Sequence, residues 1–183
     1  PVSAGAEAAA LPALDSAGAV YLYHMESGRA VGRKGETDRR AAGASVKLLS
    51  GLVACEWLGS RLDETVEITD AMLAGTGGRV FDLAAGEVLS WRELLLLALC
   101  GSYNDAYDVI AYSIGNGEQV GVANYVELLN RRAKELGADS TMAGDASGIA
   151  DNSYTTAADL CLIARAAAEN AVYVAFTGLK SGT

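Results

Sequence analysis

The sequence predicts an α+β fold, or a small antiparallel sheet with a helical insert. An apolar and aromatic segment at 19–25 is followed by a turn and by a second extended segment at 30–33, which is the pattern of a β-hairpin. A further short extended piece is expected at 65–69. Downstream of the hairpin, apolar residues recur at helical spacing in several segments between 44 and 169. Strands grouped apart from helices are typical of the α+β class.

Four helices are expected along the chain. The first runs from Ala44 to a glycine stop at Gly59. The second begins at the sequence Ser90-Trp91-Arg92-Glu93, a capping box in which the serine caps the helix and the glutamate reaches back to it. The third covers about 124–136 and the last about 156–169.

Composition limits the classes of partner. The chain has 183 residues, 51% of them hydrophobic, so it can bury the core of one domain. Its formal net charge is -9. An acidic chain repels the phosphate backbone, so no nucleic acid partner is expected, and anionic membrane surfaces are disfavoured for the same reason.

Histidine and cysteine usage excludes several kinds of site. His24 is the only histidine, so a Ser-His-Asp triad would have to use it, yet it lies in the predicted hairpin beside a turn. The three cysteines, Cys55, Cys100 and Cys161, lie among apolar residues without C-x-x-C spacing, and we expect them to be small buried side chains. No metal site and no cofactor are predicted.

Three short segments remain as candidates for chemistry. Residues 43–50 contain Ser45 and Lys47 at a helix start, residues 101–105 contain Ser102 and Asn104, and residues 178–183 contain Lys-Ser-Gly. Each is weak alone. A serine at a helix start is usually a cap, and Ser-x-Asn in a loop is usually turn chemistry.

In order and spacing, the three segments resemble the S-x-x-K, S-x-N and K-[TS]-G set of penicillin-binding proteins and serine β-lactamases. The intervening sequence is most similar to the low-molecular-weight D-alanyl-D-alanine carboxypeptidases. It shares with them a hairpin at 20–33, a linker from 62 to 95, and the Ser-Gly-Ile and Tyr-Thr-Thr-Ala-Ala-Asp-Leu segments within 147–160. The resemblance covers about 18–183 and implies a β-lactamase/transpeptidase-like fold, with an antiparallel sheet flanked by helices and a helical subdomain.

The resemblance also implies a mechanism. A serine would form an acyl-enzyme, and a lysine whose pKa is lowered by burial and nearby cations would be its base, because no histidine is suitably placed. Carried over by motif, Lys47 is the base, and Ser102 and Asn104 relay the proton and hold the substrate amide. The resemblance assigns substrate binding to Lys180, Ser181, Gly182 and Thr183, with Lys180 on the substrate carboxylate and the Thr183 N–H in the oxyanion hole.

The first motif departs from the family pattern. Ser45 and Lys47 are two residues apart rather than three, which puts them about 200° apart around a helix. One interpretation is a catalytically dead protein. The other is that the printed sequence lacks one residue, so that the nucleophile is either Ser45 or an unprinted serine adjacent to it. We expect the second, because the surrounding sequence fits an active enzyme.

The third motif departs as well, because the segment 170–177 that leads to it is short. We therefore expect a break between about 170 and 180, or further polypeptide, such as a second chain, that pairs beside 179–183 and completes the sheet. The predicted organisation is an Ala-rich N-terminus at 1–15 and a catalytic domain at 16–183 that lacks its C-terminal strands. Its sheet part would comprise 16–43 and 177–183, and its helical part 44–170.

The function that the resemblance implies is that of an exported serine DD-carboxypeptidase, acting outside the cytoplasm. It would remove the terminal D-alanine from peptidoglycan stem peptides and be acylated by β-lactam antibiotics. A serine β-lactamase is an alternative, although no convincing Glu-x-x-x-Asn loop is present to hold a deacylating water. A catalytically degenerate, wall-binding homologue is the alternative from outside the enzymes.

Overall fold

The computed structural model describes residues 16–115 and 121–179. Within these ranges it shows seven α-helices and three two-stranded antiparallel ribbons, which confirms the predicted α+β class. The strands are β1 (Val20–His24), β2 (Arg29–Lys34), β3 (Arg40–Ala41), β4 (Thr65–Glu67), β5 (Val88–Ser90) and β6 (Tyr154–Thr155). The helices are α1 (Val46–Leu58), α2 (Asp70–Leu73), α3 (Trp91–Leu99), α4 (Asn104–Ile114), α5 (Gly121–Glu135), α6 (Ala157–Glu169) and α7 (Ala171–Thr177).

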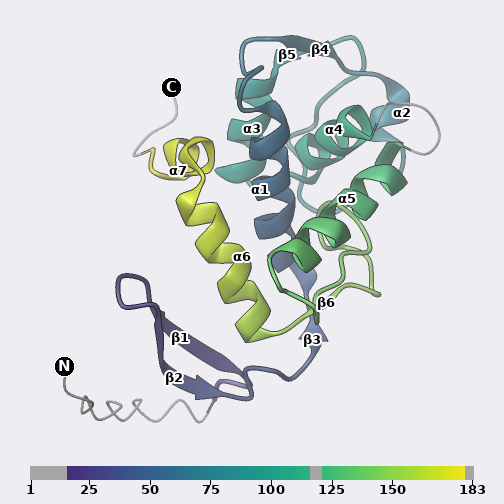
Figure 1. Ribbon diagram of the computed structural model, residues 1–183. Coiled ribbons are helices and arrows are strands. Elements are labelled where there is room, and N and C mark those ends of the chain that lie inside the picture. The colour runs from purple at the N-terminus through teal and green to yellow at the C-terminus, as the bar shows by residue number, and fades with distance from the viewer. Residues whose placement is uncertain (1–15, 116–120, 180–183) are drawn as a thin grey trace.

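The predicted hairpin is confirmed as β1 and β2, which pair from Val20↔Lys34 to His24↔Arg29. The register shifts between Leu22 and Tyr23, where Val31 of β2 has no partner, which marks a bulge in β2. The hairpin lies at one end of the molecule, where β1 contacts α6 (Figure 1). Arg165 of α6 lies over the Tyr23 ring, 4.6 Å from its centre.

Helix α1 is the centre of the helical body, and it contacts α3, α4, α5, α6 and α7 (Figure 1). It is buried on most sides, since Leu49, Leu52, Val53 and Ala54 are all at most 2% exposed. Gly51 permits the close packing, because a Cβ there would lie 2.5 Å from a Leu99 methyl carbon. The apolar area removed from water around α1 is therefore the main source of stability in this part of the fold.

The predicted capping box is confirmed at the start of α3. The Ser90 hydroxyl accepts from the Glu93 N–H, and the Glu93 carboxylate accepts from the Ser90 N–H at 2.8 Å. The same serine is the last residue of β5, which pairs with β4 (Thr65↔Ser90). The cap therefore fixes where this ribbon turns into a helix.

Two segments differ from the prediction. Ser-x-Asn was expected in a loop, but Asn104 is the first residue of α4, which buries seven of its residues against the core. The segment 170–177, expected to be a short link, forms α7, capped by the Asn170 side chain accepting from the Tyr173 N–H. Both helices are short, and much of the stability of a short helix comes from tertiary packing, which the sequence pattern does not reveal.

The end of the chain corrects one further prediction. The break or further polypeptide expected near 170–183 stays a prediction. Thr177, expected at the start of a sheet strand, is the last residue of α7, and the Leu179 N–H bonds back to the Phe176 carbonyl. The remaining positions of the expected strand, 180–183, lie outside the described residues.

The cysteine prediction holds only in part. Cys55 is buried, whereas Cys161 is partly exposed and Cys100 is exposed at the end of α3. For membrane association, no single helix within 16–115 and 121–179 has the length and apolar character needed to cross a bilayer. Only α6 and α7 taken together reach that length, with a bend of 92° between them.

Candidate active site

The chain enters α1 through a tight turn. Strand β3 pairs with β6, one turn of 3₁₀ helix follows at Gly43–Ser45, and α1 begins at Val46. The Ser45 hydroxyl donates to the Ala42 carbonyl at 2.5 Å. Ser45 lines a hollow shared with Thr155 and Leu160, on the side of α1 that faces β6 and α6. Its hydroxyl therefore stabilises the local turn through this hydrogen bond.

Lys47 lies on a different side of α1. Its Nζ donates to the Ser102 carbonyl at 2.7 Å and lies 3.0 Å from the Ser102 hydroxyl. The structure thus brings Lys47 and Ser102 together, but no contact among the described residues joins Ser45 to Lys47. This agrees with the angle of about 200° that two helical residues two positions apart subtend.

The position one turn before Lys47 is occupied by Ala44. Residues three apart eclipse one another in a 3₁₀ turn and are neighbours on an α-helix. The S-x-x-K pattern would place its serine at this position. In this chain the position carries a methyl group, and Ala44 is exposed.

The surroundings of Lys47 favour its neutral form. Burial lowers the pKa of Lys47 below its ordinary value of 10.5, and the Arg79 guanidinium lowers it further. Asp108 and Asp145 oppose the shift. Arg79 is held by its Nε, which donates to the Gly101 carbonyl at 2.9 Å, and its guanidinium lies 5.0 Å from the centre of the Tyr103 ring. An amine with a lowered pKa loses its proton more readily than an ordinary lysine, which suits a general base.

Asp145 organises the loop that covers the start of α1. Its carboxylate accepts the N–H groups of residues 147–150. Gly148, at φ 83°, is pressed against the turn before α1, and a Cβ there would lie within 1.9 Å of the Gly43 carbonyl oxygen. Only glycine fits this contact, so the Ser147-Gly148-Ile149 segment has a structural reason to be there.

Asn104 lies beside the Lys47–Ser102 pair and is 4% exposed. Its Nδ2 donates to the Gly77 carbonyl at 2.6 Å, while its Oδ1 is buried and has no partner among the residues that the structure describes. The Asn104 side chain is therefore held in the core by its bond to the loop at Gly77.

Asp105 holds the neighbouring loop in place. It is 2% exposed, and its carboxylate accepts the backbone N–H groups of Phe81 and Leu83. Burial raises the pKa of Asp108, which accepts from the Thr76 hydroxyl at 2.6 Å. The sequence prediction missed Arg79, Asp108 and Asp145, because no short motif marks them and only the fold brings them near Lys47.

The other predicted site residues are placed as follows. Lys180, Ser181, Gly182 and Thr183 lie outside the described residues. His24 is exposed on the hairpin and bonds locally, with its Nδ1 3.0 Å from the Ser27 hydroxyl. No group of three or more histidine, cysteine or carboxylate side chains in the described ranges could hold a metal ion.

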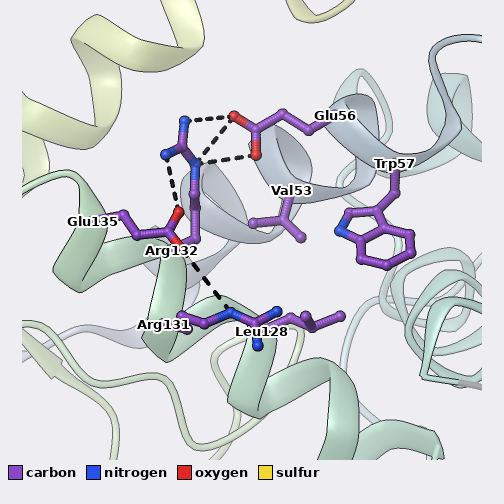
Figure 2. A pocket seen from close by; sticks show the side chains of 7 residues that line it. All are labelled: Val53, Glu56, Trp57, Leu128, Arg131, Arg132 and Glu135. Atoms are coloured by element: carbon purple, nitrogen blue, oxygen red, sulfur yellow. Dashed lines mark hydrogen bonds and ion pairs between the residues drawn. The ribbon is translucent and has the colours of Figure 1, made fainter.

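A separate pocket of about 210 Å³ lies between α1 and α5, at the far end of α1 from Lys47 (Figure 2). Its lining residues are Val53, Glu56, Trp57, Leu128, Arg131, Arg132 and Glu135. Its charged groups pair with one another: Arg132 with Glu56 at 2.8 Å and with Glu135 at 3.2 Å, and Arg131 with Glu135 at 4.0 Å. It contains no hydroxyl or thiol nucleophile, so it is not the candidate site.

Comparison with known proteins identifies the family of the chain. A family model described as D-alanyl-D-alanine carboxypeptidase matches residues 6–181. The chain is 25% identical over 161 residues to the D-alanyl-D-alanine carboxypeptidase DacF of Bacillus subtilis, covering 86% of this chain and 40% of DacF. It is 31% identical over 160 residues to the D-alanyl-D-alanine carboxypeptidase DacB2 of Mycobacterium tuberculosis, covering 86% of this chain and 52% of DacB2.

Solved structures give the same result. The D-alanyl-D-alanine carboxypeptidase of Mycobacterium tuberculosis superposes with a TM-score of 0.77 at 29% identity, covering 88% of this chain and 60% of that one. DacD of Francisella tularensis gives a TM-score of 0.75 at 28% identity, covering 83% and 37%. The chain thus spans between about two fifths and three fifths of the length of these relatives. Because the family model covers nearly the whole sequence, the chain belongs to the D-alanyl-D-alanine carboxypeptidase family.

Proposed function

We propose that this chain is an acyl-transferring domain of a serine DD-carboxypeptidase, which removes the terminal D-alanine from peptidoglycan stem peptides. The observation that carries the proposal is the amine of Lys47, which is partly buried, has a lowered pKa and lies 3.0 Å from a serine hydroxyl. A lysine in this state can deprotonate a serine without any histidine. The family membership supplies the class of substrate.

Asn104, together with Ser102, is proposed to relay the proton and hold the substrate amide, by its match to the second motif of the family. Lys180 is proposed to bind the substrate's terminal carboxylate, together with Ser181, Gly182 and Thr183, by their match to the third motif of the family. Such a charge-assisted contact would select peptides with a free C-terminus.

The acyl-enzyme step implies two further properties. A β-lactam presents a strained amide to the same serine, so the protein is proposed to be acylated by penicillin. Because peptidoglycan lies outside the cytoplasm, the place of action is proposed to be extracytoplasmic. We also propose that further polypeptide, or a second chain, pairs beside 179–183 and completes the sheet.

The test of activity is the release of D-alanine by the 183-residue chain. A peptide that ends in D-alanyl-D-alanine should lose its last residue, whereas the same peptide ending in L-alanine should not. Release from both peptides at equal rates, or from neither, would contradict the proposal.

Intact mass after mixing with benzylpenicillin separates the alternatives. A lasting adduct is expected for a DD-carboxypeptidase, a short-lived adduct for a serine β-lactamase, and no adduct for a degenerate wall-binding homologue. The mass of the untreated protein also decides whether the natural chain carries one serine more than the printed sequence.

A further inference from the structure

The guanidinium of Arg79 is anchored through its Nε and leaves both Nη atoms available. Nε donates to the Gly101 carbonyl at 2.9 Å, and the guanidinium carbon lies 5.0 Å from the centre of the Tyr103 ring. The residue is exposed, and among the described residues neither Nη atom has a hydrogen-bond partner. The planar group is therefore held in position while its outer N–H groups can donate to another molecule.

No carboxylate within residues 16–115 and 121–179 forms an ion pair with Arg79. In contrast, Arg61, Arg92 and Arg132 have carboxylate partners at 2.7, 2.9 and 2.8 Å. Carboxylates are abundant in this chain, which carries 23 acidic residues against 14 basic ones. Because the Arg79 side chain is already fixed, it loses little freedom on binding, and it is suited to an anion that a ligand brings.

The loop that carries Arg79 is bound to the second motif. The Asn104 N–H donates to the Arg79 carbonyl at 2.7 Å, and the Asn104 Nδ2 donates to the Gly77 carbonyl at 2.6 Å. Arg79 also lies close enough to Lys47 for its charge to lower the pKa of that amine. The guanidinium is therefore fixed beside the candidate active site.

An apolar surface lies next to this cation. Phe81 is 52% exposed, and its ring packs edge-on against the Tyr103 ring, with 5.3 Å between the ring centres. The Tyr103 ring thus contacts both Phe81 and the Arg79 guanidinium. A ligand side chain with a short hydrocarbon stem and a terminal carboxylate matches these two neighbours, with the stem against Phe81 and the carboxylate at Arg79.

We propose that Arg79 is a specificity-determining residue, which binds a carboxylate in the side chain that precedes D-alanyl-D-alanine in the substrate. The inference rests on the proposed function, because it concerns the peptide cleaved in that reaction. In the proposed function, Lys180 binds the terminal carboxylate and Asn104 holds the amide of the acyl part. Because the loop of Arg79 is bonded to Asn104, a carboxylate bound at Arg79 belongs to the acyl part.

Release of D-alanine from two isosteric peptides tests this assignment. The peptides are N-acetylated and carry L-glutamate or L-glutamine before D-alanyl-D-alanine. Because Arg79 is exposed, its charge-assisted hydrogen bonds should contribute at the lower end of their range, so kcat/KM should be about 10-fold higher for the glutamate peptide. Arg79→Gln should lower this ratio to about 1. The control Arg92→Gln, which removes a cation paired with Asp63 at the other end of α3, should keep the ratio.

Binding of the same peptides to the Lys47→Ala variant, measured by calorimetry, needs no turnover and holds whichever serine carries the acyl group. The glutamate peptide should bind about 10-fold more tightly, and adding Arg79→Gln should remove the difference. Equal binding of the two peptides, or a kcat/KM ratio that Arg79→Gln leaves unchanged, would overturn the inference even where D-alanine is released. Release from neither peptide, with the difference in binding intact, would contradict the proposed function alone.

Discussion

Each end of helix α1 holds a charged side chain, but the surroundings of the two charges differ. At its C-terminal end, Glu56 is paired with Arg132, and Arg132 in turn with Glu135, so each charge has an opposite partner (Figure 2). At its N-terminal end, Lys47 contacts the carbonyl and hydroxyl of Ser102, and no carboxylate in the described part of the chain forms an ion pair with it. An opposite charge nearby stabilises the charged form of its partner, whereas a partly buried amine bonded to a hydroxyl can exchange protons with it.

The largest effect is expected from a variant that removes the amine of Lys47. Lys47→Ala should lower the rate of acylation by benzylpenicillin about 10²–10⁴-fold, the usual contribution of a positioned general base. The matched control is Arg132→Ala, which removes a cation at the other end of α1. It should leave acylation unchanged and cost only about 0.2–1 kcal/mol of unfolding free energy. Equal rates for Lys47→Ala and the wild type would remove the distinction between the two ends.

The next largest effect is expected from a variant that adds a serine hydroxyl one turn before Lys47. Ala44→Ser restores S-x-x-K, placing a hydroxyl one turn before Lys47, and should raise the acylation rate about 10²-fold, the lower end of what a positioned base contributes. Trypsin cleaves after Arg40 and Lys47, so the adduct of this variant should be found on peptide 41–47. Val46→Ser, which also adds a serine near Lys47 but at an adjacent position on the helix, serves as the control. No gain in Ala44→Ser would show that this end needs more than a correctly spaced serine.

A smaller effect is expected from the third motif. Lys180→Ala should remove a charge-assisted contact worth about 1.5–3 kcal/mol, which is a loss of about 10–150-fold with a peptide that has a free terminal carboxylate. The same peptide with an amidated terminus should lose far less. A loss of equal size on both peptides would rule out carboxylate binding by Lys180.

The pH profile of acylation tests the surroundings of Lys47 while Lys47 itself is kept. Because burial and Arg79 lower the pKa of Lys47, acylation should rise with pH and reach half its maximum below pH 10.5. Arg79→Gln removes a cation that disfavours the charged amine, so the pKa should rise and the midpoint should move to higher pH, with a loss of a few fold in rate near neutral pH. A midpoint that stays in place would show that Arg79 does not act on Lys47.

The smallest effect on acylation is expected from a substitution in the hairpin, which lies away from both ends of α1. His24→Gln should keep acylation within a few fold of wild type, because His24 is exposed and, within the described residues, its ring bonds only to Ser27. Loss of acylation in a variant whose circular dichroism is unchanged would instead favour a histidine-dependent mechanism.

The local sequence pattern predicted much of the fold. The apolar and aromatic segment and the turn within 19–33 predicted the hairpin, and the Ser90–Glu93 capping box predicted the start of α3, because both depend on neighbours in sequence. Helices α4 and α7 were not predicted. Each is short, and its burial against α1 and α3 is a property of distant segments.

For the site, the sequence by itself determined that Lys47, Ser102 and Asn104 are candidates and that Ser45 and Lys47 are out of phase on one helix, since motif spacing and helical geometry need no tertiary information. Only the tertiary structure decided that the hydroxyl at the amine is that of Ser102, 55 positions along the chain. It also decided that Arg79, Asp108 and Asp145 surround Lys47. Their effect on its pKa depends on burial and on distance through space, which no spacing along the chain encodes.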